Sequence, residues 1–143
     1  MEQHITMNIT RGLTKEVKKV REDVFMKEQG FICEFDEIDK DAYHIVLYLN
    51  DEPAATGRTY PKEDGTCYMI GRIAVQKQYR KLHLGKKVVN YLEIKAKSQG
   101  AKKTALSAQV SARGFYEKIG YQASGEIYLD EKVEHIYMEK QIS

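Results

Sequence analysis

The most informative stretch of the chain is Ile73-Ala74-Val75-Gln76-Lys77-Gln78-Tyr79-Arg80-Lys81-Leu82-His83-Leu84-Gly85-Lys86-Lys87. An apolar strand end runs into a short basic loop and then into the first turn of a helix. Unpaired N–H groups at a helix N-terminus lie at the positive end of the helix dipole and bind anions. Gly85 allows a ligand to approach the backbone closely. The stretch therefore fits a pyrophosphate site, and it also fits an ordinary strand-loop-helix with a solvated basic face.

Hydrophobic periodicity around this stretch predicts alternating strands and helices. Leu84, Val88, Leu92 and Ala96 repeat every four residues, as on one face of an amphipathic helix that Gly100 ends. Thr14 is a plausible N-cap for an earlier helix that ends at Gly30. Further patterns predict a short helix over 112–119 and the strands 5–9, 43–49, 54–60, 67–75, 104–110, 121–128 and 133–139. The acidic stretch 31–41 predicts a loop, with a short helix inside it as the alternative. This order predicts a mixed α/β sheet with helices packed on it.

Composition bounds the class of protein. The chain has 143 residues, which predicts a single domain over 1–143, and its formal charge is only +2. The longest apolar run, 45–49, is far shorter than the ~20 residues that cross a membrane, and no signal peptide is visible, so we expect a cytoplasmic protein. Cys33 and Cys67 form no CxxC pair or zinc spacing. They favour two reduced thiols, with one disulfide as the alternative.

Several motifs together resemble the GCN5-related N-acetyltransferases. The loop resembles the coenzyme A signature Arg/Gln-x-x-Gly-x-Gly/Ala, with His83 in place of its first glycine. The stretch Phe115-Tyr116-Glu117-Lys118-Ile119-Gly120-Tyr121 is close to a recurrent family helix. A small bacterial branch is matched further by Ala55-Thr56-Gly57-Arg58, Gly71-Arg72-Ile73-Ala74-Val75, Arg21 to Phe25, Glu28-Gln29, Asp39 with His44, and His135. The motifs cover nearly the whole chain in the family's order.

This resemblance implies a twisted, mostly antiparallel sheet of about seven strands, splayed between strands 4 and 5, with helices on both faces. Acetyl-CoA would bind in the splay, with its pantetheine along strand 4 and its pyrophosphate on the loop. The implied cofactor-binding residues are Ile73, Ala74, Val75, Arg80, Lys81, Leu82, His83, Leu84, Gly85, Lys86 and Lys87. No metal is implied. Oligomeric state stays open between a monomer and a homodimer.

The resemblance also implies roles around the reacting group. Tyr116 would protonate the leaving thiolate, or else it only packs the helix on the sheet. His44 is a candidate general base, because histidine changes charge near neutral pH, or a hydrogen-bonded structural residue. Arg72 would bind an anionic substrate group or pair with Glu34, Glu37 or Asp39. The remaining implied substrate-binding residues, with solvated or structural positions as the alternative, are Arg21, Glu28, Gln29 and Gln109.

The sequence thus predicts an acetyl-CoA-dependent N-acetyltransferase, in which a primary amine attacks the thioester directly in a ternary complex. A catalytically silent acyl-CoA-binding module is the alternative. A nucleic-acid binder that uses Lys77, Arg80, Lys81, Lys86 and Lys87 is disfavoured by the small net charge. We therefore expect acetyl-CoA and an amine as partners, and neither nucleic acid nor membrane.

Overall fold

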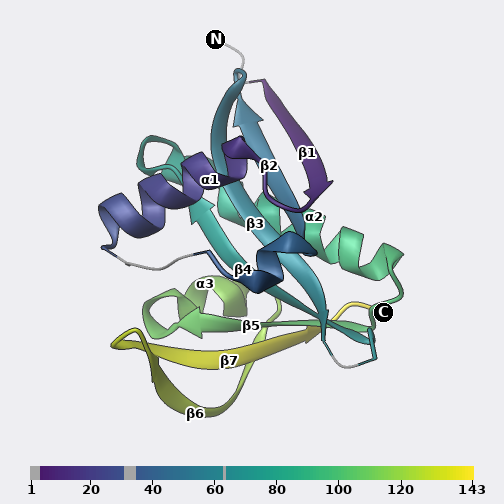
Figure 1. The fold of residues 1–143 in the computed structure, drawn as a ribbon. Helices are drawn as coiled ribbons and strands as arrows, with labels where there is room; N and C mark the ends of the chain where they lie inside the picture. The colour runs from purple at the N-terminus through teal and green to yellow at the C-terminus, as the bar shows by residue number, and fades with distance from the viewer. Residues whose placement is uncertain (1–3, 31–34, 63) are drawn as a thin grey trace.

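The computed structural model describes residues 4–30, 35–62 and 64–143. They form a seven-stranded sheet in the order β1-β2-β3-β4-β5-β7-β6 (Figure 1). Neighbouring strands are antiparallel except β4 and β5, which are parallel. The strands are β1 (Ile5–Arg11), β2 (Tyr43–Leu49), β3 (Glu52–Lys62), β4 (Cys67–Val75), β5 (Lys103–Gln109), β6 (Gln122–Asp130) and β7 (Val133–Gln141). The predicted mixed α/β fold is confirmed.

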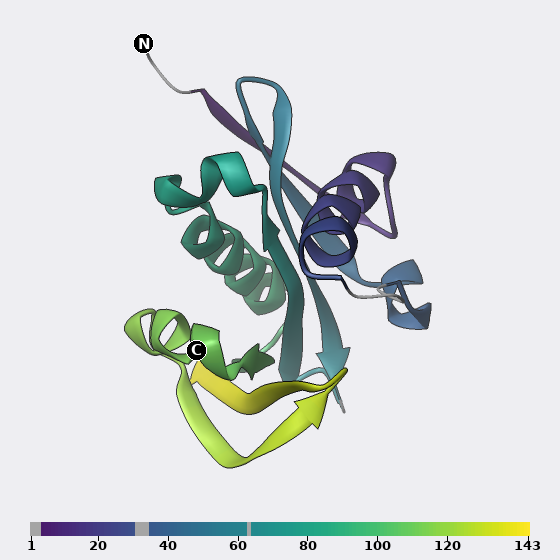
Figure 2. The ribbon, with the colours of Figure 1, turned by 90° about the vertical axis from the view of Figure 1, so that its left-hand side faces the viewer.

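Helical segments connect these strands on both faces of the sheet. They are α1 (Lys15–Arg21), the π-helical η1 (Glu22–Glu28), the 3-10 segments η2 (Glu37–Lys40), η3 (Lys77–Leu82) and η4 (Val110–Ala112), α2 (Leu84–Ser98) and α3 (Arg113–Lys118). Figure 2 shows α1 on one face and α2 on the other, with the β6–β7 hairpin at one end of the sheet. The order of elements matches the sequence-based prediction.

Local chemistry explains where the elements begin and end. Thr14 caps α1 as predicted, and its hydroxyl accepts a hydrogen bond from the Val17 N–H at 3.3 Å. The turn predicted at 50–53 is shorter than expected. Asn50 and Asp51 both take left-handed φ values, 50° and 71°, which closes a two-residue hairpin, so β3 begins at Glu52 rather than at residue 54.

The position of α2 on the sheet depends on Gly57. Ile45, Leu47, Val88 and Leu92 are buried members of the core. A Cβ atom at Gly57 would lie only 2.6 Å from Val88 Cγ1 and 2.9 Å from Leu92 Cδ1. A side chain there would push the helix away from β3. The glycine therefore sets how closely α2 packs on β3.

The edge strand β6 is irregular. Ser124 pairs with Tyr137 and Tyr128 pairs with His135, so the three residues 125–127 lie opposite the single residue between those partners. Gly125 supplies the left-handed φ of 83° that this bulge contains. Past the bulge, the register of β6 on β7 places Tyr128 beside His135.

A buried ion-pair network ties α1 and η2 to the sheet. Asp39 accepts hydrogen bonds from Arg21 Nη1 at 2.7 Å and from Arg58 Nη1 at 2.8 Å. Asp36 accepts from Arg58 at 2.7 Å and lies 3.4 Å from Arg72 Nη2. Arg21 and Asp39 are both 0% exposed. These five residues join four separate segments around one pair of carboxylates.

The network also sets the acidity of its carboxyl groups. Burial by itself raises the pKa of Asp39, but the hydrogen bonds and charges of Arg21 and Arg58 outweigh it and hold that pKa well below its usual range. The pKa of Asp36 is lowered in the same way, by Arg58 against the effect of burial. Both groups are therefore carboxylates at neutral pH.

We expect Asp39→Asn to lower the free energy of unfolding by about 3–5 kcal/mol, because two buried guanidinium groups lose their shared anion. Urea unfolding at pH 7 measures this loss. Asp41→Asn is the matched control. Asp41 lies 3.8 Å from Arg11 in a pair with 65% and 85% exposed side chains, and its loss should change stability by less than about 1 kcal/mol. Similar losses in both variants would contradict the assigned role of Asp39.

The same network predicts the pH dependence of stability. Because folding lowers the pKa values of Asp36 and Asp39, their contribution is fully present above the ordinary carboxyl range and is lost as pH falls below about 4. Asp39→Asn should flatten this acid loss. An unchanged acid slope in the variant would mean that other carboxylates cause it.

Candidate active site

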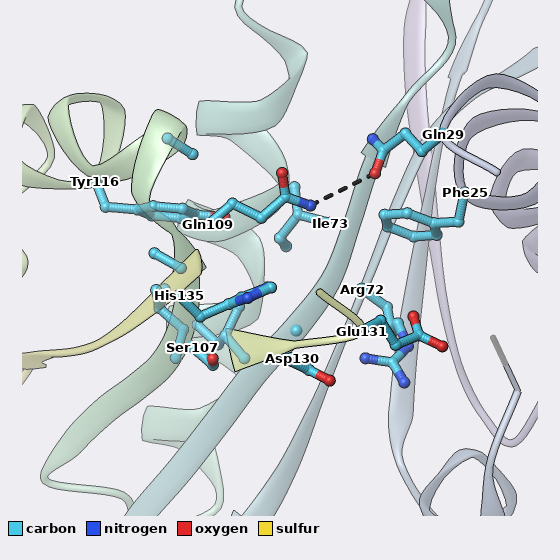
Figure 3. A pocket seen from close by; sticks show the side chains of 15 residues that line it. Phe25, Gln29, Arg72, Ile73, Ser107, Gln109, Tyr116, Asp130, Glu131 and His135 are labelled. Carbon is cyan, nitrogen blue, oxygen red and sulfur yellow. Dashed lines mark hydrogen bonds between the residues drawn. The ribbon is translucent and has the colours of Figure 1, made fainter. Parts of the chain in front are cut away.

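A cavity opens where β4 and β5 part. The two strands pair only from Cys67 with Lys103 to Met69 with Ala105, and beyond that point they diverge. The cavity has a volume of about 440 Å³. Figure 3 shows the side chains that line it, which come from both strands, η1, α3 and the β6–β7 hairpin. In the described part of the chain, the β5-facing edge of β4 has no strand partner past Met69, so its polar groups need other partners.

A β-bulge lies in β4 at this cavity. Thr56 pairs with Ala74 and Arg58 pairs with Gly71, so Arg72 and Ile73 together lie opposite Gly57. Arg72 takes a left-handed φ of 52°, which is rare for a residue with a side chain. The ion pair of Arg72 with Asp36 links this strained position to the buried network.

Tyr116 reaches the cavity from α3 (Figure 3). Its ring packs edge-on against Phe115, with centroids 5.0 Å apart, and against Tyr121 at 5.9 Å. Burial raises the pKa of Tyr116 to about 12, so the phenol keeps its proton at neutral pH. No hydrogen-bond partner for its hydroxyl is found in residues 4–30, 35–62 and 64–143. The geometry leaves a proton donor in the cavity.

Two amides meet across the cavity mouth. Gln109 Nε2 lies 3.5 Å from Gln29 Oε1, and the two side chains come from β5 and from the end of η1 (Figure 3). Both residues line the cavity, together with Phe25 and Arg72. The predicted substrate-binding residues Gln29, Arg72 and Gln109 are thus brought together.

The predicted anion loop lies at the start of α2. His83 precedes the helix with φ 58° and ψ 29°, and no side chain caps the helix N-terminus. Lys81, Lys86 and Lys87 are exposed around it. Arg80 donates from Nε to the Val75 carbonyl at 3.1 Å and forms a two-pronged pair with Glu28, one arm of which is 2.6 Å long.

The predicted residues Arg21 and His44 lie outside the cavity lining. Arg21 is held in the buried network by Asp39. His44 is 1% exposed, and its Nε2 lies 3.0 Å from the Asp39 carbonyl oxygen. Burial, with further contributions from nearby arginines, lowers the pKa of His44, so its imidazole is neutral. Glu28 pairs with Arg80, as described above, and is not among the lining residues.

The comparisons with known proteins agree on one family. The acetyltransferase (GNAT) domain profile matches residues 13–142. The chain is 36% identical to YyaT, an uncharacterized protein of Bacillus subtilis, over 96% of this chain and 97% of YyaT. It is also 36% identical to YjcF, an uncharacterized N-acetyltransferase of the same organism, over 88% of this chain and 91% of YjcF.

The chain belongs to the GNAT family of N-acetyltransferases. The fold agrees with this assignment. An acyl-CoA N-acyltransferase from Pseudomonas aeruginosa superposes with a TM-score of 0.83 at 22% identity, covering 96% of this chain and 99% of that one. Among the described residues, no group of three or more His, Cys, Asp or Glu could hold a metal ion, and no helix is long and apolar enough to cross a membrane.

Several cavity residues of this GNAT protein were not singled out by sequence reasoning. His135 was noted only as part of the family pattern, and Phe25 only in a motif, while Ser107, Asp130 and Glu131 received no role. The available signal was the position of Asp130 and Glu131 in a turn between two closing strands. Arg72 pairs with Asp36, which was not among its predicted partners, and the predicted partner Glu37 pairs with Lys40. Glu34 and Cys33 lie outside the described residues, and Cys67 is buried on β4.

The departure at His83 has a structural explanation. The family glycine is replaced at a position with a left-handed backbone, which histidine enters more readily than most side chains do. Replacement by a β-branched residue should strain the loop. We expect His83→Val to be less stable than His83→Gly by about 1–3 kcal/mol in urea unfolding. Equal stabilities of the two variants would contradict the left-handed geometry.

Proposed function

We propose that this protein transfers an acetyl group from acetyl-CoA to a primary amine by direct attack in a ternary complex. The observation that carries the proposal is the opening between β4 and β5, which is lined on one side by the Tyr116 hydroxyl. Such an opening leaves strand backbone available to an extended ligand with amide groups of its own.

The residues present fit acetyl-CoA. The β5-facing edge of β4 has no strand partner past Met69 in the described residues, and at Ile73 to Val75 it can pair with amides of a pantetheine chain. The Val75 carbonyl there already accepts one hydrogen bond, from Arg80 Nε. The uncapped N-terminus of α2, over residues 82–87, offers N–H groups to a pyrophosphate, with Lys81, Lys86 and Lys87 beside it. When bound, acetyl-CoA supplies the thioester carbonyl that the amine attacks and the thiolate that leaves.

Arg80 is paired with Glu28 in this structure, and it must leave that carboxylate before it can bind a phosphate. Its two-pronged pair with Glu28 joins the loop to the end of η1, and this contact lowers the pKa of Glu28. We infer that backbone N–H groups make the first phosphate contacts and that Arg80 exchanges Glu28 for phosphate. Glu28 would then be released toward the acceptor side, where Gln29 already lines the cavity.

Tyr116 acts as the acid in the proposed reaction. Because its pKa is raised to about 12, its hydroxyl carries a proton throughout the neutral range. Its packing against Phe115 and Tyr121 holds the ring in one orientation. The side chain can therefore deliver a proton to the leaving sulfur without first reorienting.

The first test is binding. Acetyl-CoA at about 100 times its Kd should raise the free energy of unfolding by about 2.7 kcal/mol, which thermal unfolding reports as a higher Tm. Adenosine 3′,5′-bisphosphate, which shares the nucleotide of coenzyme A and lacks the pantetheine, is the control that separates nucleotide binding from binding along β4. No Tm shift with millimolar acetyl-CoA would refute the proposal. Binding without turnover of any amine, across amino sugars, polyamines, small amines and lysine peptides, would favour the silent acyl-CoA-binding module instead.

The second test is Tyr116→Phe. This change removes the proton donor and keeps the ring, so the Tm and the acetyl-CoA-induced Tm shift should stay nearly unchanged. We expect kcat to fall by roughly ten- to a hundredfold, with little change in the KM for acetyl-CoA. Phe115→Leu, on the same helix, is the control for packing. Full kcat in Tyr116→Phe under conditions where chemistry limits turnover would leave Tyr116 with a packing role alone.

A further inference from the structure

His135 lies on β7, between the neighbouring strands β5 and β6, and it lines the cavity. It pairs in register with Gln109 of β5 and with Tyr128 of β6. Although the residue is only 8% exposed overall, its ring lines the cavity between Gln109 and Ser107 (Figure 3). A buried imidazole therefore faces the same space as the Tyr116 hydroxyl.

A backbone contact determines which ring nitrogen of His135 carries the proton. Nδ1 lies 2.8 Å from the carbonyl oxygen of Val133. A carbonyl oxygen only accepts hydrogen bonds, so the proton of the neutral imidazole resides on Nδ1. Nε2 then keeps its lone pair, and no partner for it is found in the described part of the chain. The imidazole is arranged as a proton acceptor on its cavity side.

The ring of His135 is also held in place. It stacks on Tyr128 with centroids 6.1 Å apart and an interplanar angle of 24°. The hydroxyl of Tyr128 in turn forms a hydrogen bond with the hydroxyl of Ser107. The bulge in β6 brings Tyr128 into this position. Three neighbouring strands thus orient one imidazole.

His44 has the opposite arrangement. Its Nε2 donates to the Asp39 carbonyl, and its Nδ1 is buried without a hydrogen-bond partner in the described residues. It is enclosed by Arg21 and Arg58, and it does not line the cavity. A substrate amine in the cavity could not reach it directly.

We propose that His135, and not His44, is the general base that removes the proton from the acceptor amine; this inference rests on the proposed acetyl transfer. The acceptor enters as an ammonium ion and first loses one proton to water. As the neutral amine nitrogen then forms its bond to the acetyl carbon, its second proton passes to Nε2 of His135. The carbon–sulfur bond breaks, and one proton passes from the Tyr116 hydroxyl to sulfur. Water then takes the proton from His135 and returns one to Tyr116, so that charge and atoms balance.

The charged groups around His135 suit this role. Asp130 and Glu131 line the same cavity from the β6–β7 turn, Arg72 lines it from β4, and Tyr116 lines it from α3. The two carboxylates attract an incoming ammonium group. Arg72 opposes this attraction, but Asp36 partly neutralises Arg72.

The principal test is His135→Asn. The asparagine amide can still donate to the Val133 carbonyl in place of Nδ1–H, but it cannot accept a proton. With putrescine, glucosamine and a lysine peptide as acceptors, and thiol release as the readout, we expect kcat/KM to fall about a hundredfold or more. We expect the wild-type rate to fall toward acid pH as the base becomes protonated, and we expect this fall to be absent in His135→Asn. If none of these amines is acetylated, hydrolysis of acetyl-CoA, in which water is the acceptor, is assayed in place of amine acetylation.

Two matched variants and two further readouts complete the design. His4→Asn, on the exposed N-terminal side, should leave the rate and pH profile unchanged, and the acetyl-CoA-induced Tm shift should persist in His135→Asn. In ¹⁵N NMR, neutral His135 should be protonated on Nδ1. Protonation on Nε2 would overturn the proposal, as would an unchanged pH profile in His135→Asn or its loss in His44→Gln instead. Absence of any acetyl-CoA-induced Tm shift in wild type would refute the proposed function itself, so the two failures are distinguishable.

Discussion

The short parallel ladder between β4 and β5 is the constraint on which the site depends. Three residue pairs hold the two strands together, and the strands then separate. A parallel pair that parts in this way leaves one strand edge exposed to the interior of the protein, where unpaired N–H and C=O groups are costly. The cavity, Tyr116 from α3 and His135 from β7 all adjoin that edge. The candidate site therefore exists because β4 and β5 pair over only part of their lengths.

The Asp36 and Asp39 network stabilises the other side of this opening. Arg58 lies on β3, which pairs with β4 on both sides of the bulge, and Arg72 lies in the bulge itself. Both arginines pair with Asp36. Arg21 brings α1 to the same carboxylates. A left-handed residue in a strand is unfavourable unless its surroundings hold it. The network supplies such surroundings, and this explains why several charged residues are buried beside a cavity that only Arg72 of the network lines.

Much of the fold could be predicted because it depends on local patterns. The four-residue period of α2, the cap at Thr14 and the turn at residues 130–132 all act over a few neighbours. The roles of Arg21 and His44 could not be predicted in this way. Both residues contact Asp39, whose carboxylate accepts from Arg21 and whose backbone carbonyl lies 3.0 Å from His44 Nε2. Asp39 follows Arg21 by 18 positions, and no periodicity shows which of these groups will meet. The position of His135 at the cavity could not be predicted for a related reason. The irregular pairing of β6 with β7 determines which residues flank His135.

The bulge in β6 also affects the tendency of this edge strand to pair with the same strand of another molecule. β6 is an edge strand, and it carries three consecutive exposed apolar side chains, Ile127, Tyr128 and Leu129. A straight edge with these residues would be a template for intermolecular strand pairing and aggregation. The two additional residues and the left-handed Gly125 interrupt its ladder of N–H and C=O groups. The same irregularity that places an aromatic ring beside the cavity therefore protects the protein against fibril-like association along this edge.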